Sequence, residues 1–263
     1  VKASYQGNRV NPFILDSTLA SRAYPAPEKL TVQEARQRGS GLSTVEGVVT
    51  RVAENGPYIQ DETGGLYVFE SEGAFGQALG ETIQRGTRLE ATGRLSYFYG
   101  LLQLTGVQYS GLFDVVDQDQ ALPAPDTLTL GEIAENGEEY EAELVRVANF
   151  SIQADGDDTF QASTGYTVED ETGTLSLRVP SGSALVGEPI PARATFQGVL
   201  GQFNDENIGS DTPDTGYRLL AIEGGDLEVL QERLPSETAI DVTRSFGEPD
   251  TGEVVGQVPV VDE

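Results

Sequence analysis

Short runs that alternate apolar and polar residues, or that are rich in β-branched and aromatic residues, recur along the chain between glycine-rich turns. Such runs are typical of β-strands. In the first part of the chain they predict five strands, over Thr44–Ala53, Tyr58–Gln60, Leu66–Glu70, Thr87–Tyr97 and Leu101–Tyr109. A glycine-rich connector separates the third run from the fourth. The pattern therefore predicts a small, turn-rich β-domain rather than a helical one.

One stretch of residues occurs twice, 98 positions apart. Pro25–Val32 reads PAPEKLTV, and Pro123–Leu130 reads PAPDTLTL. Each copy contains a Thr-x-x-Glu capping box, which starts at Thr31 in the first copy and at Thr129 in the second. A capping box predicts that a short helix begins at that threonine.

Further blocks follow in the same order in both copies. Val49–Val52 matches Leu144–Val147 at an offset of 95, which predicts that the second copy's first strand covers Tyr140–Val147. Asp61–Leu66 matches Asp170–Leu175 at an offset of 109, and a glycine-bearing strand follows in each copy. Matched blocks at a spacing near 100 residues predict two homologous domains.

Each copy has the element order of one barrel type: a lead-in helix, three strands, a connector and two more strands. The phrase V-x-G-V-V…Y-I-Q-D-E-T-G-G-L-Y-V-F…A-T-G-R-L resembles OB-fold domains, including those attached to secreted bacterial nucleases. The resemblance covers about residues 30–112 and 128–225. It implies an all-β chain of two tandem five-stranded OB-fold barrels, each with a short lead-in helix, plus extended terminal tails. The predicted parts are an N-terminal tail (1–29), a first barrel (30–122), a second barrel with acidic loop insertions (123–230) and an acidic C-terminal tail (231–263).

The amino-acid composition excludes several kinds of catalytic and metal site. The 263 residues include no His, Cys, Met or Trp. Ser–His–Asp and Cys–His sites, thiolate nucleophiles, ordinary zinc sites and disulfides are therefore excluded. The Asp-Glu pairs that begin at Asp61 and Asp170 lie in D-E-T-G turns, where Asp and Gly serve backbone geometry. We therefore predict that the protein is not an enzyme.

The net charge of the chain indicates which classes of partner it can bind. With 43 acidic and 16 basic side chains, the formal net charge is −27, which opposes a polyanion. Tyr58, Tyr67 and Phe69, with Arg51 nearby, resemble the aromatic face on which OB barrels bind single strands. Cross-strand packing is the alternative role of these rings, and acidic residues surround them. The prediction is therefore that the chain has no nucleic-acid partner, and an acidic surface also suits a salt-adapted source.

The second copy gains two acidic insertions that contain neither Lys nor Arg. The first follows the opening strand and is about 14 residues long by the offsets 95 and 109, and the second spans Phe203–Gly216. Clustered carboxylates suit Ca²⁺, which takes six to eight oxygen ligands. Solvated acidic turns are the alternative. The candidate metal ligands are Asp155, Asp157, Asp158, Asp205, Glu206, Asp211 and Asp214.

The tails contain apolar positions that alternate as strands do. They predict strand addition onto a barrel edge, either in the same chain or in a neighbour. The predicted function is a non-catalytic structural subunit that assembles head-to-tail into a filament or surface fibre, with itself as partner. The candidate subunit contacts are Val10, Phe13, Ile14, Leu15, Ile240, Val242 and Phe246. Alternatives are a secreted binding module for a cation, glycan or protein, or a nucleic-acid-binding accessory.

The expected location is extracellular or at the cell surface. The chain begins at Val1, as a processed and exported protein does, although a trimmed chain would begin the same way. No apolar run approaches the ~18–20 residues of a membrane helix, so membrane insertion is not expected.

Overall fold

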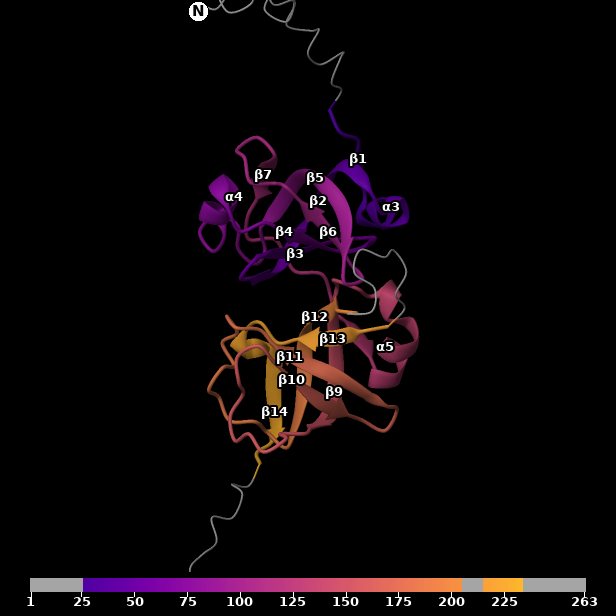
Figure 1. The fold of residues 1–263 in the computed structure, drawn as a ribbon, viewed down its shortest axis with the longest axis vertical. Helices are drawn as coiled ribbons and strands as arrows, with labels where there is room; N and C mark the ends of the chain where they lie inside the picture. The colour runs from indigo at the N-terminus through magenta and orange to yellow at the C-terminus, as the bar shows by residue number, and fades with distance from the viewer. Residues whose placement is uncertain (1–25, 205–214, 234–263) are drawn as a thin grey trace, which may run out of the picture. The chain divides into compact units, whose positions relative to one another are not determined.

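The computed structural model describes residues 26–204 and 215–233, whose ribbon is drawn in Figure 1. These residues form two β-barrels and belong to one unit, which ends at Arg233. No helix within them is long and apolar enough to cross a membrane.

The first barrel closes because its longest strand pairs on both sides. Its elements are β1 (Lys29–Leu30), α3 (Val32–Arg38), β2 (Gly41–Ala53), β3 (Gly56–Asp61), β4 (Gly64–Phe69), α4 (Gly73–Ala78), β5 (Arg88–Phe98), β6 (Leu101–Thr105) and β7 (Phe113–Asp117). The sheet order is β1-β2-β3-β4-β6-β5-β7, and an additional β2–β5 pairing closes it. Five strands, β2 to β6, thus form the barrel, while β1 and β7 extend its edges.

The second barrel repeats this arrangement. Its elements are β8 (Asp126–Leu128), α5 (Leu130–Asn136), η2 (Gly137–Glu139), β9 (Leu144–Ile152), β10 (Thr164–Glu169), β11 (Thr174–Val179), β12 (Arg193–Gln202), β13 (Tyr217–Leu220), η3 (Gly224–Asp226) and β14 (Leu227–Gln231). Its sheet order is β14-β12-β13-β11-β10-β9-β8, closed by a β12–β9 pairing. The predicted fold of two tandem OB-type barrels, each with a lead-in helix, is confirmed.

The pairing register corrects the sequence alignment of the first strands. Leu30 lies opposite Val45, and Leu128 lies opposite Val147, so Val45 and Val147 are equivalent at an offset of 102. The predicted offset of 95 was therefore wrong by seven residues, and the strand expected from Tyr140 begins at Leu144. The offset rises from 102 to 109 at the D-E-T-G turn, so the first insertion is seven residues long rather than 14. The block Val49–Val52 is too short to fix the register of a strand, and the pairing of the strands does fix it.

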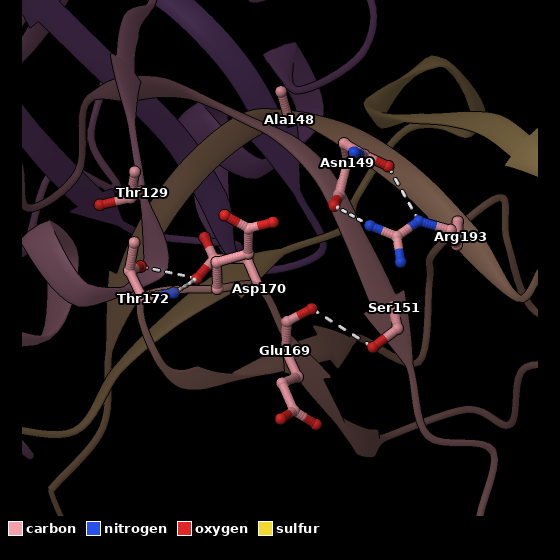
Figure 2. Close-up of a pocket in the computed structure, with 9 residues that line it drawn as sticks. Thr129, Ala148, Asn149, Ser151, Glu169, Asp170, Thr172 and Arg193 are labelled. Carbon is pink, nitrogen blue, oxygen red and sulfur yellow. Dashed lines mark hydrogen bonds between the residues drawn. The ribbon is translucent and has the colours of Figure 1, made fainter.

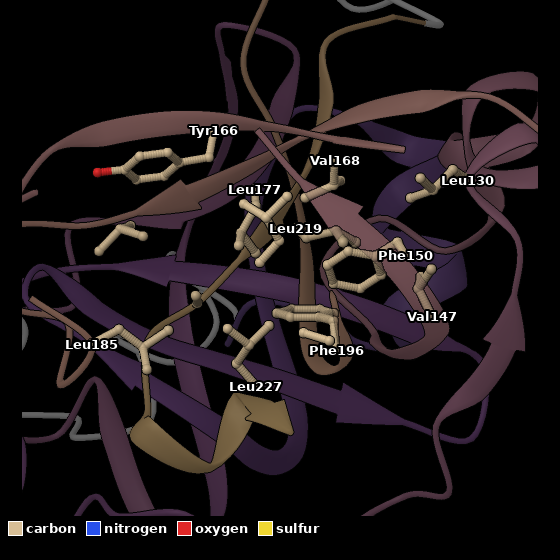
Figure 3. Packing of buried hydrophobic residues seen from close by; sticks show 14 of the residues in the cluster. Leu130, Val147, Phe150, Tyr166, Val168, Leu177, Leu185, Phe196, Leu219 and Leu227 are labelled. Atoms are coloured by element: carbon tan, nitrogen blue, oxygen red, sulfur yellow. The ribbon is translucent and has the colours of Figure 1, made fainter. Parts of the chain in front are cut away.

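Each barrel has its own apolar core. In the second barrel the rings of Phe150, Tyr166 and Phe196 pack with Leu177 and Leu219, and all five side chains are at most 1% exposed (Figure 3). Burying a side chain of this size contributes roughly 1.5–3 kcal/mol. The cores therefore stabilise each barrel independently of the residues that join them.

A third apolar cluster contains residues of both barrels, including Tyr58, Tyr67, Leu144 and Leu220. Polar contacts accompany it. The amide of Gln60 donates to Glu143 and accepts from the backbone N–H of Leu144, at 3.1 and 3.0 Å.

Charged pairs add to these contacts. The guanidinium of Arg36 lies 2.6 Å from carboxylate oxygens of both Glu138 and Glu141. Glu141 is 1% exposed, and burial raises its pKa even though the charge of Arg36 partly offsets this. Buried groups thus depend on partners in the other barrel.

Candidate functional site

A cavity of about 300 Å³ is lined by strands and loops of both barrels, and we call it the aromatic groove. Its first-barrel side comes from β3, β4, β5, β6 and the β2–β3 loop. Its second-barrel side comes from β11, β12, β13 and neighbouring loops. The lining residues are Ala53, Glu54, Asn55, Tyr58, Tyr67, Phe69, Phe98, Leu101, Gln103, Ser163, Arg178, Pro180, Ser181, Gln202, Phe203, Arg218, Leu220 and Ile222.

The floor of the groove is a pair of stacked tyrosines. Tyr58 and Tyr67 lie opposite each other on β3 and β4, and their ring centroids are 4.4 Å apart. They are 5% and 7% exposed, and burial raises the pKa of both hydroxyls. Phe69 packs edge-on against Tyr67 but is 43% exposed. The predicted cross-strand packing thus describes the tyrosines, whereas Phe69 keeps an accessible ring.

The β5–β6 hairpin supplies two further rings. Phe98 is 51% exposed and packs edge-on against Tyr99. Tyr99 in turn stacks on Phe203 of the second barrel, with centroids 4.3 Å apart and planes at 20°. The backbone N–H of Asn204 donates to the carbonyl oxygen of Tyr99 at 2.7 Å, which fixes the two segments together.

Two arginines of the second barrel also line the groove. Ser176 lies opposite Arg218 on the neighbouring parallel strand, so Arg178 is two residues farther along β11. Leu177 and Leu219 are fully buried in the barrel core, which places both arginines on the other face. The Cζ atom of Arg218 lies 4.8 Å from the centroid of Phe203.

Neither guanidinium has an ion-pair partner among the described carboxylates, in contrast to Arg36 and Arg51. A guanidinium nitrogen of Arg178 donates to the carbonyl oxygen of Ser163. The Nε atom of Arg218 is buried without a hydrogen-bond partner. Burial lowers the pKa of Arg218, and the positive charge of Arg178 lowers it further.

One acid lines the same groove. The carboxylate of Glu54 accepts a hydrogen bond from the hydroxyl of Ser181 at 2.6 Å, and Glu54 is the single acidic residue among the described residues that line the groove. The groove thus carries two arginines against one glutamate, in a chain whose net charge is −27. The formal charge of these described lining residues is opposite in sign to that of the whole chain.

Arg51, which the sequence analysis named beside the tyrosines, does not line the groove. It is 2% exposed, and its Nε donates to Asp226 at 2.7 Å. Two of its other nitrogens donate to backbone carbonyls of Thr50 and Gln197. Arg51 therefore joins the barrels and has no donor directed to solvent.

The D-E-T-G turns hold the lead-in helices. In the second barrel one carboxylate oxygen of Asp170 accepts from the backbone N–H of Leu130, and the other accepts from the N–H and hydroxyl of Thr172. Thr172 in turn accepts from the N–H of Gly131. In the first barrel Asp61 and Thr63 make the same bonds to the N-terminus of α3.

Figure 2 shows the open, polar pocket beside this turn, where Asp170 contacts Thr172 and Arg193 is held by Asn149. The hydrogen bonds lower the pKa of Asp170 although its burial opposes them. Both oxygens of this aspartate already accept bonds, so the geometry assigns the turn to helix capping.

The candidate metal ligands are only partly described. Asp155 and Asp158 are exposed, and Asp157 accepts a long 3.3 Å bond from the hydroxyl of Tyr166. No three acidic side chains of the described ranges gather as a metal site requires. Four candidates lie outside the described residues, namely Asp205, Glu206, Asp211 and Asp214. Calcium binding stays a prediction.

The predicted subunit contacts also lie outside the described residues. They are Val10, Phe13, Ile14, Leu15, Ile240, Val242 and Phe246. Neither the barrels nor the comparisons below supply an observation in favour of a self-assembling filament.

A curated protein and several solved structures resemble the chain. It is 27% identical over 222 residues to Endonuclease YhcR of Bacillus subtilis. The match covers 80% of this chain but only 16% of the relative. The chain thus spans about a sixth of that relative's length. No protein-family profile matches the chain.

The structural likenesses concern the fold alone. The p204 HINb domain covers 70% of this chain and 95% of its own, at 12% identity and a TM-score of 0.34. The match to a murine DNA-binding protein with bound double-stranded DNA covers 73% of this chain and 98% of that protein's chain, also at 12% identity and a TM-score of 0.34. The ygiW protein of E. coli covers 31% and 86%, at 18% identity and a TM-score of 0.26.

These findings correct one prediction. The expectation that nucleic acid is not a partner is contradicted, because the curated relative, at 27% identity, is by name an endonuclease. The error came from net charge, which sums the whole surface and does not describe one groove. Extracellular location stays a prediction.

The sequence analysis missed most of the groove. It named Tyr58, Tyr67 and Phe69, but not Phe98, Phe203 or the two arginines. Phe98 and Phe203 lie at or next to the end of a strand, and aromatic residues at such positions could have indicated the groove from the sequence. The sequence could not have indicated that the second barrel's arginines lie beside the first barrel's rings, since this depends on how the two barrels pack.

Proposed function

We propose that this chain is a non-catalytic binding region that holds single-stranded nucleic acid in the aromatic groove. The observation that carries the proposal is the combination of exposed rings, Phe69 and Phe98, with two arginines that have no described carboxylate partner. Base–aromatic stacking contributes about 1–3 kcal/mol per base and accepts any sequence.

The groove favours a strand over a duplex. Its volume of about 300 Å³ lies at the small end of ligand sites, which suits one nucleotide unit with an unstacked base. The rings lie on β3 and β4 and at the end of β5 next to the β5–β6 loop, near the parts of an OB barrel that bind oligonucleotides. The 27% identity to an endonuclease supports a role beside nucleic acid, while cleavage remains a property of that relative.

Electrostatics predicts an unusual dependence on salt. Each phosphate contact on a single strand contributes a slope of about −0.7 to log K against log salt, so two arginines give about −1.4. The net charge of −27 repels the strand, and salt screens this repulsion. The two effects oppose each other. Affinity should therefore fall by less than about tenfold between 0.15 M and 1 M NaCl.

The test is fluorescence anisotropy with the full chain and a labelled oligothymidylate of about 15 nucleotides. We expect saturable binding, with Phe98→Ala weakening it by roughly five- to a hundredfold, the loss of one base stack. Tyr109→Ala is the matched control, because Tyr109 is 66% exposed but does not line the groove. No binding by about 100 μM at either salt, or equal effects of the two substitutions, would refute the proposal.

A further inference from the structure

The stacking of bases on aromatic rings does not account for the two arginines of the groove. Arg178 and Arg218 lie on neighbouring strands, repel each other and have no carboxylate partner in the described part of the chain. A buried donor without an acceptor costs about 1–3 kcal/mol, and the Nε of Arg218 is such a donor. In a chain with 43 acidic residues, two such cations side by side indicate a site for an anion.

The guanidinium of Arg218 is also held in place. Its Cζ lies 4.8 Å from the ring centroid of Phe203, and Phe203 stacks on Tyr99. An aromatic ring against a guanidinium reduces the rotamer freedom that binding would otherwise have to remove. The planar fork of arginine matches the oxygens of phosphate in a bidentate geometry.

On these grounds we propose that Arg178 and Arg218 form a phosphate subsite, and that Phe203 is the positioning residue that orients Arg218. The subsite would take a phosphate ester whose base stacks on an exposed ring of the groove, either within a strand or as a free nucleotide. This inference rests on the proposed function and adds to it the position of the phosphate. Glu54 lines the same groove, and its negative charge opposes the phosphate.

The experiment compares four probes on the full chain by calorimetry and anisotropy: oligothymidylate, thymidine 5′-monophosphate, thymidine and inorganic phosphate. Arg218→Met should weaken the oligonucleotide and the monophosphate by roughly ten- to a hundredfold, the loss of a charged hydrogen bond, and leave thymidine unchanged. Arg193→Met is the control, because Arg193 bonds Asn149 away from the groove. Glu54→Gln should strengthen monophosphate binding severalfold.

Two readouts separate positioning from folding. Arg218→Lys keeps the charge but loses the fork, so its affinity should lie between those of the wild type and Arg218→Met. Phe203→Leu should weaken monophosphate binding and leave thymidine unchanged, since thymidine does not need the oriented guanidinium. In ¹⁵N spectra of the wild type the Nε–H of Arg218 should shift with the monophosphate but not with thymidine.

The outcomes distinguish the two proposals. If Phe98→Ala weakens the oligonucleotide but Arg218→Met does not, the phosphate subsite is refuted while strand binding stands. If the monophosphate binds through Arg218 but the oligonucleotide does not bind, the subsite stands for free nucleotides and strand binding fails. If no probe binds, or if Arg218→Met and Arg193→Met have equal effects, the subsite is refuted.

Discussion

Replacing Arg51 by Met should destabilise the protein more than any exposed charge substitution. The Nε and Nη2 atoms of Arg51 lie 2.7 and 2.6 Å from one oxygen of Asp226, which is 0% exposed. The second oxygen of Asp226 accepts from the backbone N–H groups of Ile222 and Glu223. Methionine fills the space of the stem but leaves this carboxylate buried without a cation. Breaking a buried pair in this way costs about 3–5 kcal/mol.

The expected signal is large enough for thermal or urea unfolding of the full chain. For 150–250 residues, each kcal/mol lowers Tm by about 2–4 °C, so Arg51→Met should lower it by roughly 6–20 °C. Arg85→Met is the matched control, because Arg85 pairs at 3.0 Å with Glu223 while 48% exposed. Exposed pairs contribute about 0–1 kcal/mol.

Two further measurements isolate the ion pair. Salt near 1 M shortens the Debye length to about 3 Å and should remove the Arg85 effect but retain the Arg51 effect. Adding Asp226→Asn to Arg51→Met removes the orphaned charge, so the double variant should lose less than the sum of the two single losses. Equal shifts for Arg51→Met and Arg85→Met would show that the buried pair does not stabilise the native state as argued.

Three other predictions concern the D-E-T-G turn of the second barrel, the partly buried Glu143 and the close approach of the barrels. Asp170→Ala removes four hydrogen bonds and should cost about 1–2 kcal/mol in urea unfolding, whereas the neighbouring Glu171→Ala should change stability by less than about 0.5 kcal/mol. Burial raises the pKa of Glu143 from 4.5 to about 7, so the stability it contributes is complete below pH 4.5 and is lost as pH rises through 7. Glu143→Gln should flatten that part of a pH–stability curve, and an unchanged curve would contradict the assignment. A Cβ on Gly65 would lie 2.3 Å from a backbone carbon of the second barrel, so Gly65→Ala should lower Tm by several degrees, while Gly182→Ala, whose Cβ meets its nearest atom at 4.0 Å, should leave it unchanged.

The sequence by itself determined the two barrels and their local structure. The Thr-x-x-Glu boxes at Thr31 and Thr129 formed the predicted caps, because a cap needs only residues within one turn of helix. The D-E-T-G motifs form the predicted turns through local bonds, from Thr63 to Asp61 and from Thr172 to Asp170. Their bonds to the lead-in helices join residues about 30 to 40 positions apart and were not predicted. The alternating runs located the strands, whose side chains repeat every second residue.

Strand register and the groove were decided by the tertiary structure. The first strands of the two copies were matched seven residues from their true positions because the match rested on a block of only four residues, Val49–Val52 with Leu144–Val147, which is too short to fix a register. Net charge gave the wrong answer about nucleic acid, because it averages over positions that folding separates. Only the packing of one barrel against the other buries Arg51 on Asp226 and sets Arg178 and Arg218 beside the ring of Phe98. Those contacts join residues more than 70 positions apart, and no local pattern encodes which distant side chain a strand will face.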